Sequence, residues 1–297
     1  MERPRQTAYE VGHVAATELV DRDARDAMLS YLTIDLGRDR QFAEARAEEE
    51  VERKIAKATL RGLASSGIKV NGLDVLDLGS GLGAMSEELT LNGANVIALE
   101  PGAAWAELTR RRAERHGGKF QLKQAVGEAI PLADRSVDLV VSLQVLEHVT
   151  VPKQVLSEVW RVLRPGGHFY LACENYLAFR EGHYGVCWLP LLPKSLGALY
   201  LRMRGRDPTF LRESVTYVTY PGILRMCAAL GFVRRRDALL LQNLQKKGGV
   251  TGRALRVAAA LGGSGLLCWL NGARRTFTFG VYELFDKPGN ASDRASP

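Results

Sequence analysis

The feature that most constrains this chain is the run VLDLGSGLG at residues 75–83. An apolar strand pattern ends at Leu78, three glycines follow at alternate positions, and a helix pattern begins at Ala84. Glycine adopts left-handed backbone conformations readily and leaves room for a ligand beside the main chain. A strand that passes through such a loop into a helix is typical of a nucleotide-binding site in an α/β fold.

The rest of the sequence alternates between strand and helix patterns in the way that an α/β fold requires. This alternation predicts a parallel sheet with right-handed crossovers. Two later strand patterns and a helix pattern complete the expected elements. The predicted strands are 73–78, 95–99, 120–126, 137–143, 168–173, 232–241 and 276–285, and the predicted helices are 84–91, 103–116, 152–163 and 220–230.

The pattern divides the chain into a helical N-terminal cap, residues 1–65, and one main domain, residues 66–286. Two segments interrupt the main domain. Residues 174–216 show no clear period and are expected to form a substrate insertion, and residues 243–275 form an apolar insertion. The polar tail, residues 287–297, is expected to be disordered.

Two acidic residues next to the glycine loop indicate what kind of ligand binds there. Glu100 ends the second strand pattern, where a carboxylate can accept hydrogen bonds from both ribose hydroxyls of a nucleoside. Asp77 directly precedes the glycines, which are spaced GxGxG rather than the GxGxxG of a dinucleotide site. A carboxylate at Asp77 would repel a pyrophosphate. The charges therefore favour a cationic nucleoside such as S-adenosylmethionine (SAM) over a dinucleotide.

Four stretches together resemble the class I SAM-dependent methyltransferases, in particular the broad type 11 group. They are VLDLGSGLG (75–83), ALEP (98–101), GEAIPLADRSVDLVVSLQVLEHV (127–149) and VLRPGGHFYLA (162–172). The resemblance covers roughly residues 60–175. It implies a Rossmann-like, doubly wound sheet of seven strands in which the last strand is antiparallel.

The resemblance also implies a set of cofactor contacts. The glycine loop would line the methionine half of SAM, Glu100 would hold the ribose, and the segment from Val126 would border the adenine. Many relatives have an aspartate where this chain has Val126, so Glu128 or main-chain groups would bond the adenine here. The implied cofactor-binding residues are Asp77, Gly79, Ser80, Gly81, Gly83, Glu100, Pro101, Val126, Gly127, Glu128, Leu143 and Gln144.

An oxygen nucleophile needs a general base, and histidine often supplies it. His183 lies after the fifth strand, where substrates bind outside the carboxyl ends of parallel strands. His183 and His148 are therefore the candidate catalytic residues. Glu147-His148 resembles the ExxEH metal-binding pattern of ubiquinone-pathway O-methyltransferases, but Gln144 stands at its first position. We therefore expect no metal.

The methyl acceptor is the least constrained part of the prediction. The run GHYG…WLPLLPK (182–194) resembles an insertion in bacterial methyltransferases of surface-glycan and lipid-linked sugar synthesis. It favours a sugar hydroxyl or a glycolipid. A small-molecule acceptor, such as a phenol, a quinone or a natural product, is the alternative, and a non-catalytic subunit is a further one. Tyr176, Tyr184 and Trp188 would either wall the acceptor site or anchor the insertion.

Charge and composition indicate which classes of binding partner to expect. The net charge is +7, but the basic residues occur in short, separate clusters, so we expect no nucleic-acid partner. The basic-flanked apolar segment 253–270 would lie at a membrane surface, pack on the sheet or form a dimer interface. The four cysteines form no CxxC pair and are expected to be buried thiols. These features predict a cytoplasmic enzyme, with peripheral membrane contact as an added option.

Overall fold

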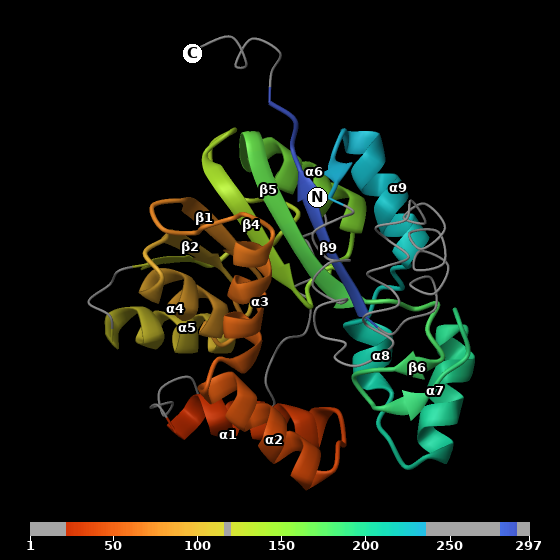
Figure 1. Cartoon of the computed structure of the whole chain (residues 1–297). Helices are drawn as coiled ribbons and strands as arrows, with labels where there is room; N and C mark the ends of the chain where they lie inside the picture. Colours follow the sequence, from red (N-terminus) through yellow and green to blue (C-terminus); the bar gives the residue numbers. More distant parts are fainter. Residues whose placement is uncertain (1–21, 116–119, 236–279, 290–297) are drawn as a thin grey trace, which may run out of the picture.

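A seven-stranded sheet in the order β3-β2-β1-β4-β5-β9-β8 forms the centre of the computed structural model, which describes residues 22–115, 120–235 and 280–289 (Figure 1). The strands from β1 to β5 are parallel, and β9 runs antiparallel to both of its neighbours. This arrangement confirms the predicted fold. The strands are β1 Asp74–Leu78, β2 Asn95–Leu99, β3 Phe120–Lys123, β4 Val137–Leu143, β5 Leu163–Glu174, β8 Val233–Arg234 and β9 Gly280–Asp286.

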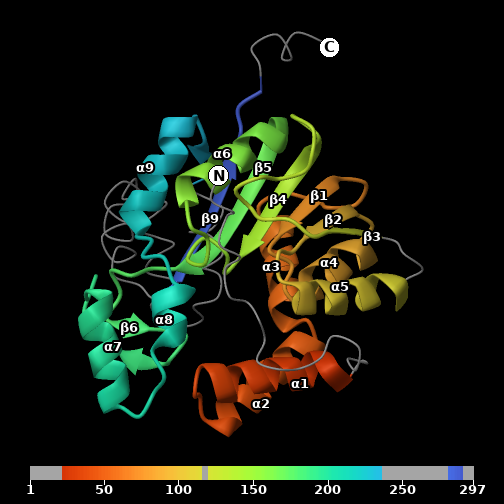
Figure 2. The ribbon, with the colours of Figure 1, turned by 180° about the vertical axis from the view of Figure 1, so that it is seen from behind.

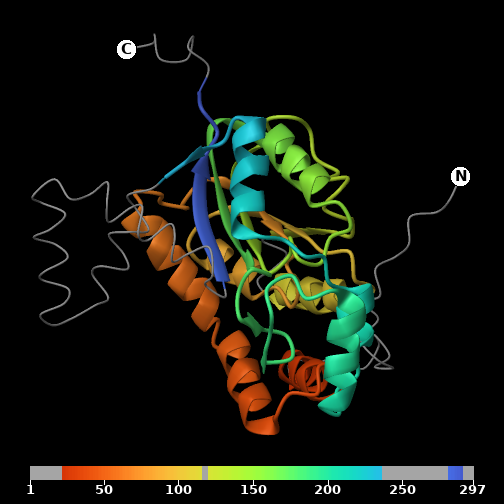
Figure 3. The same cartoon turned by 90° about the vertical axis from the view of Figure 1, so that its right-hand side faces the viewer.

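Helices cover both faces of the sheet, as Figure 3 shows from the side. One face carries α3 Lys54–Ser65, α4 Ala84–Leu91 and α5 Ala103–Arg115, and the other carries α6 Pro152–Val162 and α9 Tyr220–Leu230. The central strand β4 is apolar on both sides because Val140 packs toward α6 and α9 while Leu139 and Val141 pack toward α3 and α4.

Local signals set several of these helix boundaries as predicted. α6 begins at Pro152, whose missing N–H is no loss in the first turn. α9 begins after Thr219, whose hydroxyl accepts a hydrogen bond from the Gly222 amide at 3.2 Å. The same helix ends at Gly231, which has a φ of 97°.

The N-terminal helices lie beyond the carboxyl ends of the parallel strands (Figure 2). They are α1 Arg22–Ser30, the π-helix η1 Tyr31–Asp35 and α2 Arg40–Val51. We expected α3 in this cap as well, but Ala56 and Leu63 of α3 pack into the core against the sheet. The chain turns between α2 and α3 at Arg53, which has a φ of 56° and pairs with Glu87 and Glu88 of α4.

The insertion after β5 is ordered, although its sequence shows no clear period. It contains the two-stranded ribbon β6 Arg180–Glu181 and β7 Val186–Cys187 and the helices α7 Lys194–Met203 and α8 Thr209–Glu213. Tyr176, Tyr184 and Trp188 are buried in its core with Leu201 and Leu211. Of the two roles considered for these aromatic residues, anchoring the insertion agrees with the structure.

Some predictions need correction or lie outside the described residues. Cys187 is exposed rather than buried, because β7 is a short ribbon at the surface, whereas Cys173 and Cys227 are buried. Cys268 and the segments 243–275 and 253–270 fall in a part of the chain that the structure does not describe. Among the described helices, none combines the length and the apolarity that spanning a bilayer requires.

The expected disordered tail, 287–297, overlaps the described part of the chain at its first residues. Lys287 is only 7% exposed, and its ammonium group donates to the carbonyl oxygens of Trp160 and Leu163, each at 2.7 Å. The same group lies 4.8 Å from the centre of the Trp160 ring. Lys287 therefore ties the end of β9 to the end of α6.

Replacing this lysine tests how much that tie stabilises the domain. Lys287→Ala leaves two buried carbonyl groups without their donor, so we expect the free energy of unfolding to fall by about 1–3 kcal/mol. Urea denaturation followed by circular dichroism measures the change. Lys153→Ala, at an exposed position of α6, is the matched control and should change stability by less than ~0.5 kcal/mol. Equal effects in the two variants would contradict this role.

Candidate functional site

The in-register pairing of four parallel strands brings the predicted site residues to one edge of the sheet. Leu78 of β1 pairs with Leu99 of β2 and with Ser142 of β4, and Leu143 of β4 pairs with Ala172 of β5. The glycine loop, Glu100 and the turn after β4 therefore emerge side by side. This edge is where an α/β sheet binds its ligands.

All three glycines of the loop have a positive φ, as the sequence predicts: 72° at Gly79, 55° at Gly81 and 83° at Gly83. A Cβ atom on Gly79 would lie 2.3 Å from a methyl group of Val145, and one on Gly83 would lie 3.0 Å from the Thr109 hydroxyl oxygen. Gly79 and Gly83 therefore allow close packing within the protein. A Cβ atom on Gly81 would meet nothing within 4 Å among the described residues.

Glu100 holds the glycine loop in place. One carboxylate oxygen accepts a hydrogen bond from the Gly81 amide and the other from the Gly102 amide, each at 2.9 Å. The side chain is buried, and burial raises the pKa of the Glu100 carboxyl. Pro101 follows at the start of the next loop, where its carbonyl oxygen accepts a hydrogen bond from the Gln124 side chain.

Asp77 is buried beneath the loop, with only 1% of its surface exposed. Its carboxylate accepts a hydrogen bond of 2.5 Å from the Ser86 hydroxyl of α4. Burial raises the pKa of Asp77 to about 7, because the hydrogen bonds from Ser86 offset only part of the lost solvation and the Glu100 charge adds to the rise. Ser80, next along the loop, is also buried, and its hydroxyl lies 3.4 Å from that of Thr109.

The residues expected at the adenine follow β3. Val126 is 43% exposed, while Gly127 is buried against Val155 and Leu78. Glu128 is engaged elsewhere: one of its carboxylate oxygens accepts hydrogen bonds from the Thr150 and Val151 amides at 2.9 and 3.2 Å. It therefore caps the start of α6, and this contact is a structural alternative to the expected role at the adenine.

The turn after β4 connects the glycine loop to the histidines. Leu143 ends the strand half-buried, and Gln144 is exposed with a φ of 56°. Val145, which packs on Gly79, accepts a hydrogen bond at its carbonyl oxygen from the His148 amide at 2.8 Å. The turn therefore carries His148 close to the loop that the sequence assigns to the cofactor.

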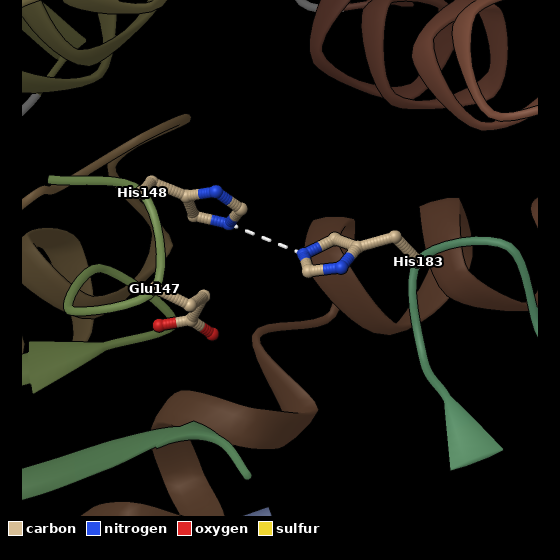
Figure 4. Close-up of side chains that lie close together, drawn as sticks. All are labelled: Glu147, His148 and His183. Atoms are coloured by element: carbon tan, nitrogen blue, oxygen red, sulfur yellow. Dashed lines mark hydrogen bonds between the residues drawn. The ribbon is translucent and has the colours of Figure 1, made fainter. Parts of the chain in front are cut away.

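The structure brings the two candidate catalytic histidines together, as Figure 4 shows. His183 lies in the turn between β6 and β7, and its Nε2 atom is 3.2 Å from Nε2 of His148. The Nδ1 atom of His148 is 2.8 Å from the Ser214 carbonyl oxygen, and Nδ1 of His183 is 2.8 Å from Glu181. Because the carbonyl oxygen can only accept, Nδ1 of His148 carries a proton.

The hydrogen-bond partners of the two rings decide which histidine carries the proton that lies between their Nε2 atoms. A neutral His148 with its proton on Nδ1 offers a lone pair at Nε2, so His183 donates from its own Nε2. His183 also donates from Nδ1 to Glu181 and is therefore a cation. Burial lowers its pKa, but Glu174 and Glu181 outweigh burial and raise that pKa to about 9. Burial and the His183 charge lower the pKa of His148 to about 3.

Three buried carboxylates surround this pair. The sequence pointed to Glu147 only as part of an incomplete metal-binding pattern and singled out neither Glu174 nor Glu181. Glu147 and Glu181 are at most 1% exposed and Glu174 is 6% exposed. Glu174 lies 3.3 Å from Nδ1 of His183, and burial raises the pKa of Glu174. Burial also raises the pKa of Glu147 to about 6. The run ENYLAFREGH at 174–183 holds two of these acids, but only the folded insertion shows that they meet.

Aromatic residues connect the histidine pair to the N-terminal helices. The Phe210 ring of α8 lies 5.7 Å from the His148 ring, 5.0 Å from the His183 ring and 5.9 Å from the Tyr31 ring, measured between centroids. Arg38 also crosses this boundary and donates to the Gly182 carbonyl oxygen at 3.0 Å. The insertion and the N-terminal helices therefore meet over the carboxyl edge of the sheet.

The buried Asp77 carboxyl predicts a specific dependence of stability on pH. Its folded-state pKa lies above the usual value of 3.8, so ionising Asp77 between about pH 4 and pH 7 costs folding free energy. Asp77→Asn removes that cost and keeps an acceptor for Ser86. We expect this variant to gain about 1 kcal/mol or more at pH 8 and much less at pH 4.

Thermal denaturation of the ligand-free chain at both pH values measures this difference. Asp26→Asn, at an exposed position of α1, is the control and should show no such dependence. A loss of stability in Asp77→Asn at pH 8 would mean that the ionised carboxylate stabilises the fold.

Comparisons with known proteins point to one family. The family profile described as a methyltransferase domain matches residues 76–171, which run from β1 into β5. A protein of Mycolicibacterium vanbaalenii named "uncharacterized methyltransferase" is 36% identical over 149 residues, 49% of this chain and 56% of that protein. A ubiquinone biosynthesis O-methyltransferase of a Methylobacterium species is 32% identical, over 40% of this chain and 50% of that protein.

The chain thus spans about half the length of the curated relatives it matches. A solved structure covers more of it: a proposed sarcosine dimethylglycine methyltransferase of Galdieria sulphuraria superposes with a TM-score of 0.50. The superposition covers 84% of this chain and 88% of that protein at 18% identity, which shows a shared fold. Residues 76–171 therefore match the methyltransferase-domain family, on a fold that the chain shares with a solved structure of that kind.

Proposed function

We propose that this protein transfers the methyl group of SAM to a hydroxyl oxygen of a small-molecule acceptor. The observation that carries the proposal is the histidine pair, His148 and His183, held by buried carboxylates at the edge of the sheet that also bears the glycine loop. An acceptor hydroxyl must lose its proton during methyl transfer. The pair and its carboxylates offer a place for that proton.

The residues at the glycine loop suit SAM by charge and by space. SAM supplies an electrophilic methyl group on a sulfonium centre, and it carries no phosphate. The carboxylates of Asp77 and Glu100 are buried on either side of the loop, where they favour a cation and disfavour a pyrophosphate. The space beside the Gly81 backbone allows a ligand to lie against the loop. The protein then positions the methyl donor and aligns it with the acceptor oxygen.

The hydrogen-bond partners suggest how the proton moves. His148 stands on the turn that packs on the glycine loop, and its Nε2 atom faces His183. His183 in turn contacts Glu181 and Glu174. Because His183 is already a cation and its Nε2–H occupies the lone pair of His148, the proton that the acceptor hydroxyl loses would pass to a buried carboxylate beside the pair. Glu147 offers an oxygen without a hydrogen-bond partner among the described residues, and burial raises the pKa of Glu147 to about 6. Orienting a histidine through a carboxylate in this way is common to many acid–base sites.

A hydroxyl acceptor also agrees with the relatives. The Methylobacterium relative is named for O-methylation in ubiquinone biosynthesis, and it is similar to 40% of this chain. That similarity favours a phenol, a quinone precursor or a related natural product as the acceptor. The insertion that carries His183 lies beyond residues 76–171, which the family profile matches, so the profile itself gives no information on the acceptor.

A glycan or a lipid-linked sugar is the second candidate acceptor, and one observation favours it. Leu196, Leu199 and Met203 of α7 are exposed and recur at helical spacing, with the exposed Arg202 and Arg204 beside them. Apolar residues flanked by basic ones suit a helix at an anionic membrane surface. Such a surface would bring the insertion close to a lipid-linked substrate.

Methyl transfer from isotope-labelled SAM to a panel of phenols, quinols, sugars and lipid-linked sugars, read by mass spectrometry, tests the proposal. We expect O-methylated product with at least one hydroxylated acceptor, most readily a phenol or a quinol. His183→Gln should lower kcat by about 10²-fold or more and leave SAM binding unchanged.

The matched control is His168→Gln, which alters a histidine of β5 that pairs with Asp286 away from the candidate site. It should keep near-native kcat. Methyl transfer only to amines or thiols would overturn the hydroxyl assignment, and transfer only to lipid-linked sugars in vesicles would establish the second candidate.

A further inference from the structure

We infer that Glu147, His148 and His183 form a binding site for a divalent transition-metal ion of the zinc type. One nitrogen from each histidine and one carboxylate oxygen of Glu147 lie within 4.8 Å of one another (Figure 4). Glu147 and His148 come from the turn after β4, and His183 comes from the insertion. The sequence predicts no metal because Gln144 stands at the first position of the pattern that ends in Glu147-His148, and the folded insertion supplies His183 as a different third ligand.

The first argument is the distance between the histidine nitrogens. The two Nε2 atoms are 3.2 Å apart. Two nitrogens that bind one zinc-like ion at about 2.0–2.1 Å in tetrahedral geometry lie roughly 3.3 Å from each other. The rings thus already have the separation that a shared ion requires, and an ion would take the place of the one proton now between them.

The second argument is how each ring is held from behind. A histidine that binds a metal almost always donates its other N–H to a backbone carbonyl or a carboxylate. Nδ1 of His148 donates to the Ser214 carbonyl oxygen, and Nδ1 of His183 donates to Glu181, both at 2.8 Å. These bonds orient both Nε2 atoms toward the same point, so that loss of the one proton between them would let both nitrogens bind an ion.

The third argument is an unsatisfied buried atom. Glu147 is completely buried, and its Oε1 atom accepts a hydrogen bond from the Glu174 amide at 3.0 Å. Its Oε2 atom is buried without a hydrogen-bond partner among the described residues. Buried carboxylate oxygens are normally paired or bound to a metal. An ion between Glu147 and the two histidines would satisfy this oxygen.

The charges nearby also favour a cation. Glu174 and Glu181 both pair with His183, and a carboxylate oxygen of the buried Glu147 lies within 4.8 Å of the same imidazole. Two imidazoles and one carboxylate are the ligand set of a zinc-type ion, whereas magnesium and calcium prefer oxygen ligands. Three protein ligands leave a coordination position open, as in catalytic zinc sites.

An open position gives the ion a function in the proposed reaction. A hydroxyl oxygen that binds there would lose its proton more easily, because the ion stabilises the negative oxygen. With the ion bound, the two histidines hold the ion instead of the proton now between them, so that proton and the one the hydroxyl loses would both leave to solvent. This role rests on the proposed methyl transfer to a hydroxyl, whereas binding of the ion does not.

Equilibrium dialysis of the full chain against Zn²⁺, after chelator treatment and with metal quantified by elemental analysis, tests the site. We expect one ion per chain. Glu147→Gln and His183→Gln should each weaken binding by more than ~10-fold, and Glu181→Gln, which removes only an orienting partner, by about 10–100-fold. The controls are His168→Gln and Cys187→Ser, the second because Cys187 is an exposed thiol. Both should bind as the native chain does.

The visible spectrum of the Co²⁺-loaded native chain provides a test that needs no variant. We expect the absorption of a four- or five-coordinate ion without the charge-transfer band of a cysteine ligand. No bound ion, an octahedral spectrum, or binding that survives in both Glu147→Gln and His183→Gln would overturn the site. Metal bound as expected by a chain that methylates no hydroxyl would leave the site standing and reject only the proposed reaction.

Discussion

The in-register ends of the parallel strands are the constraint on which the rest of the structure depends. Pairing of β1 with β2 sets the glycine loop beside Glu100, and the pairing of β4 with β5 sets the turn bearing His148 beside the insertion bearing His183. A shift of one residue in either pair would turn the side chains to the opposite face of the sheet. Both halves of the site therefore depend on the packing of the sheet core.

Buried carboxylates are the second organising feature, and they act differently in the two halves. At the glycine loop, Glu100 is satisfied by two amides and Asp77 by one hydroxyl. Around the histidines, one oxygen of the Glu147 carboxylate has no hydrogen-bond partner in the described part of the chain, and Glu174 and Glu181 both contact the His183 ring. The first arrangement supports the backbone, whereas the second concentrates charge where chemistry is proposed.

The sequence predicted the sheet and its helices well because their signals are local. Apolar runs, Pro152 and Gly231 mark elements without reference to the rest of the chain. The insertion could not be predicted in this way, since its ribbon strands have two residues each and α8 has five. Elements of that length are held by the buried Tyr184 and Trp188 rather than by periodicity.

The site likewise has one part that local sequence patterns predict and another part that they do not. The glycine loop and Glu100 were predicted because their spacing is continuous in the sequence, and the structure places them together. The meeting of Glu147 with Glu174, Glu181 and His183 depends on how the insertion folds back, which no local pattern specifies. The capping bonds of Glu128 to the start of α6 likewise appear only in three dimensions.

Calorimetric titration of the chain with SAM and with its demethylated product tests the central claim most directly. The account predicts saturable binding of both compounds to the native chain. It also predicts that Glu100→Gln weakens binding by at least ~10-fold, equivalent to about 1.4 kcal/mol, while Glu114→Gln at an exposed position of α5 leaves it unchanged. Failure of the native chain to bind either compound would contradict the claim that this domain works as a SAM-dependent enzyme.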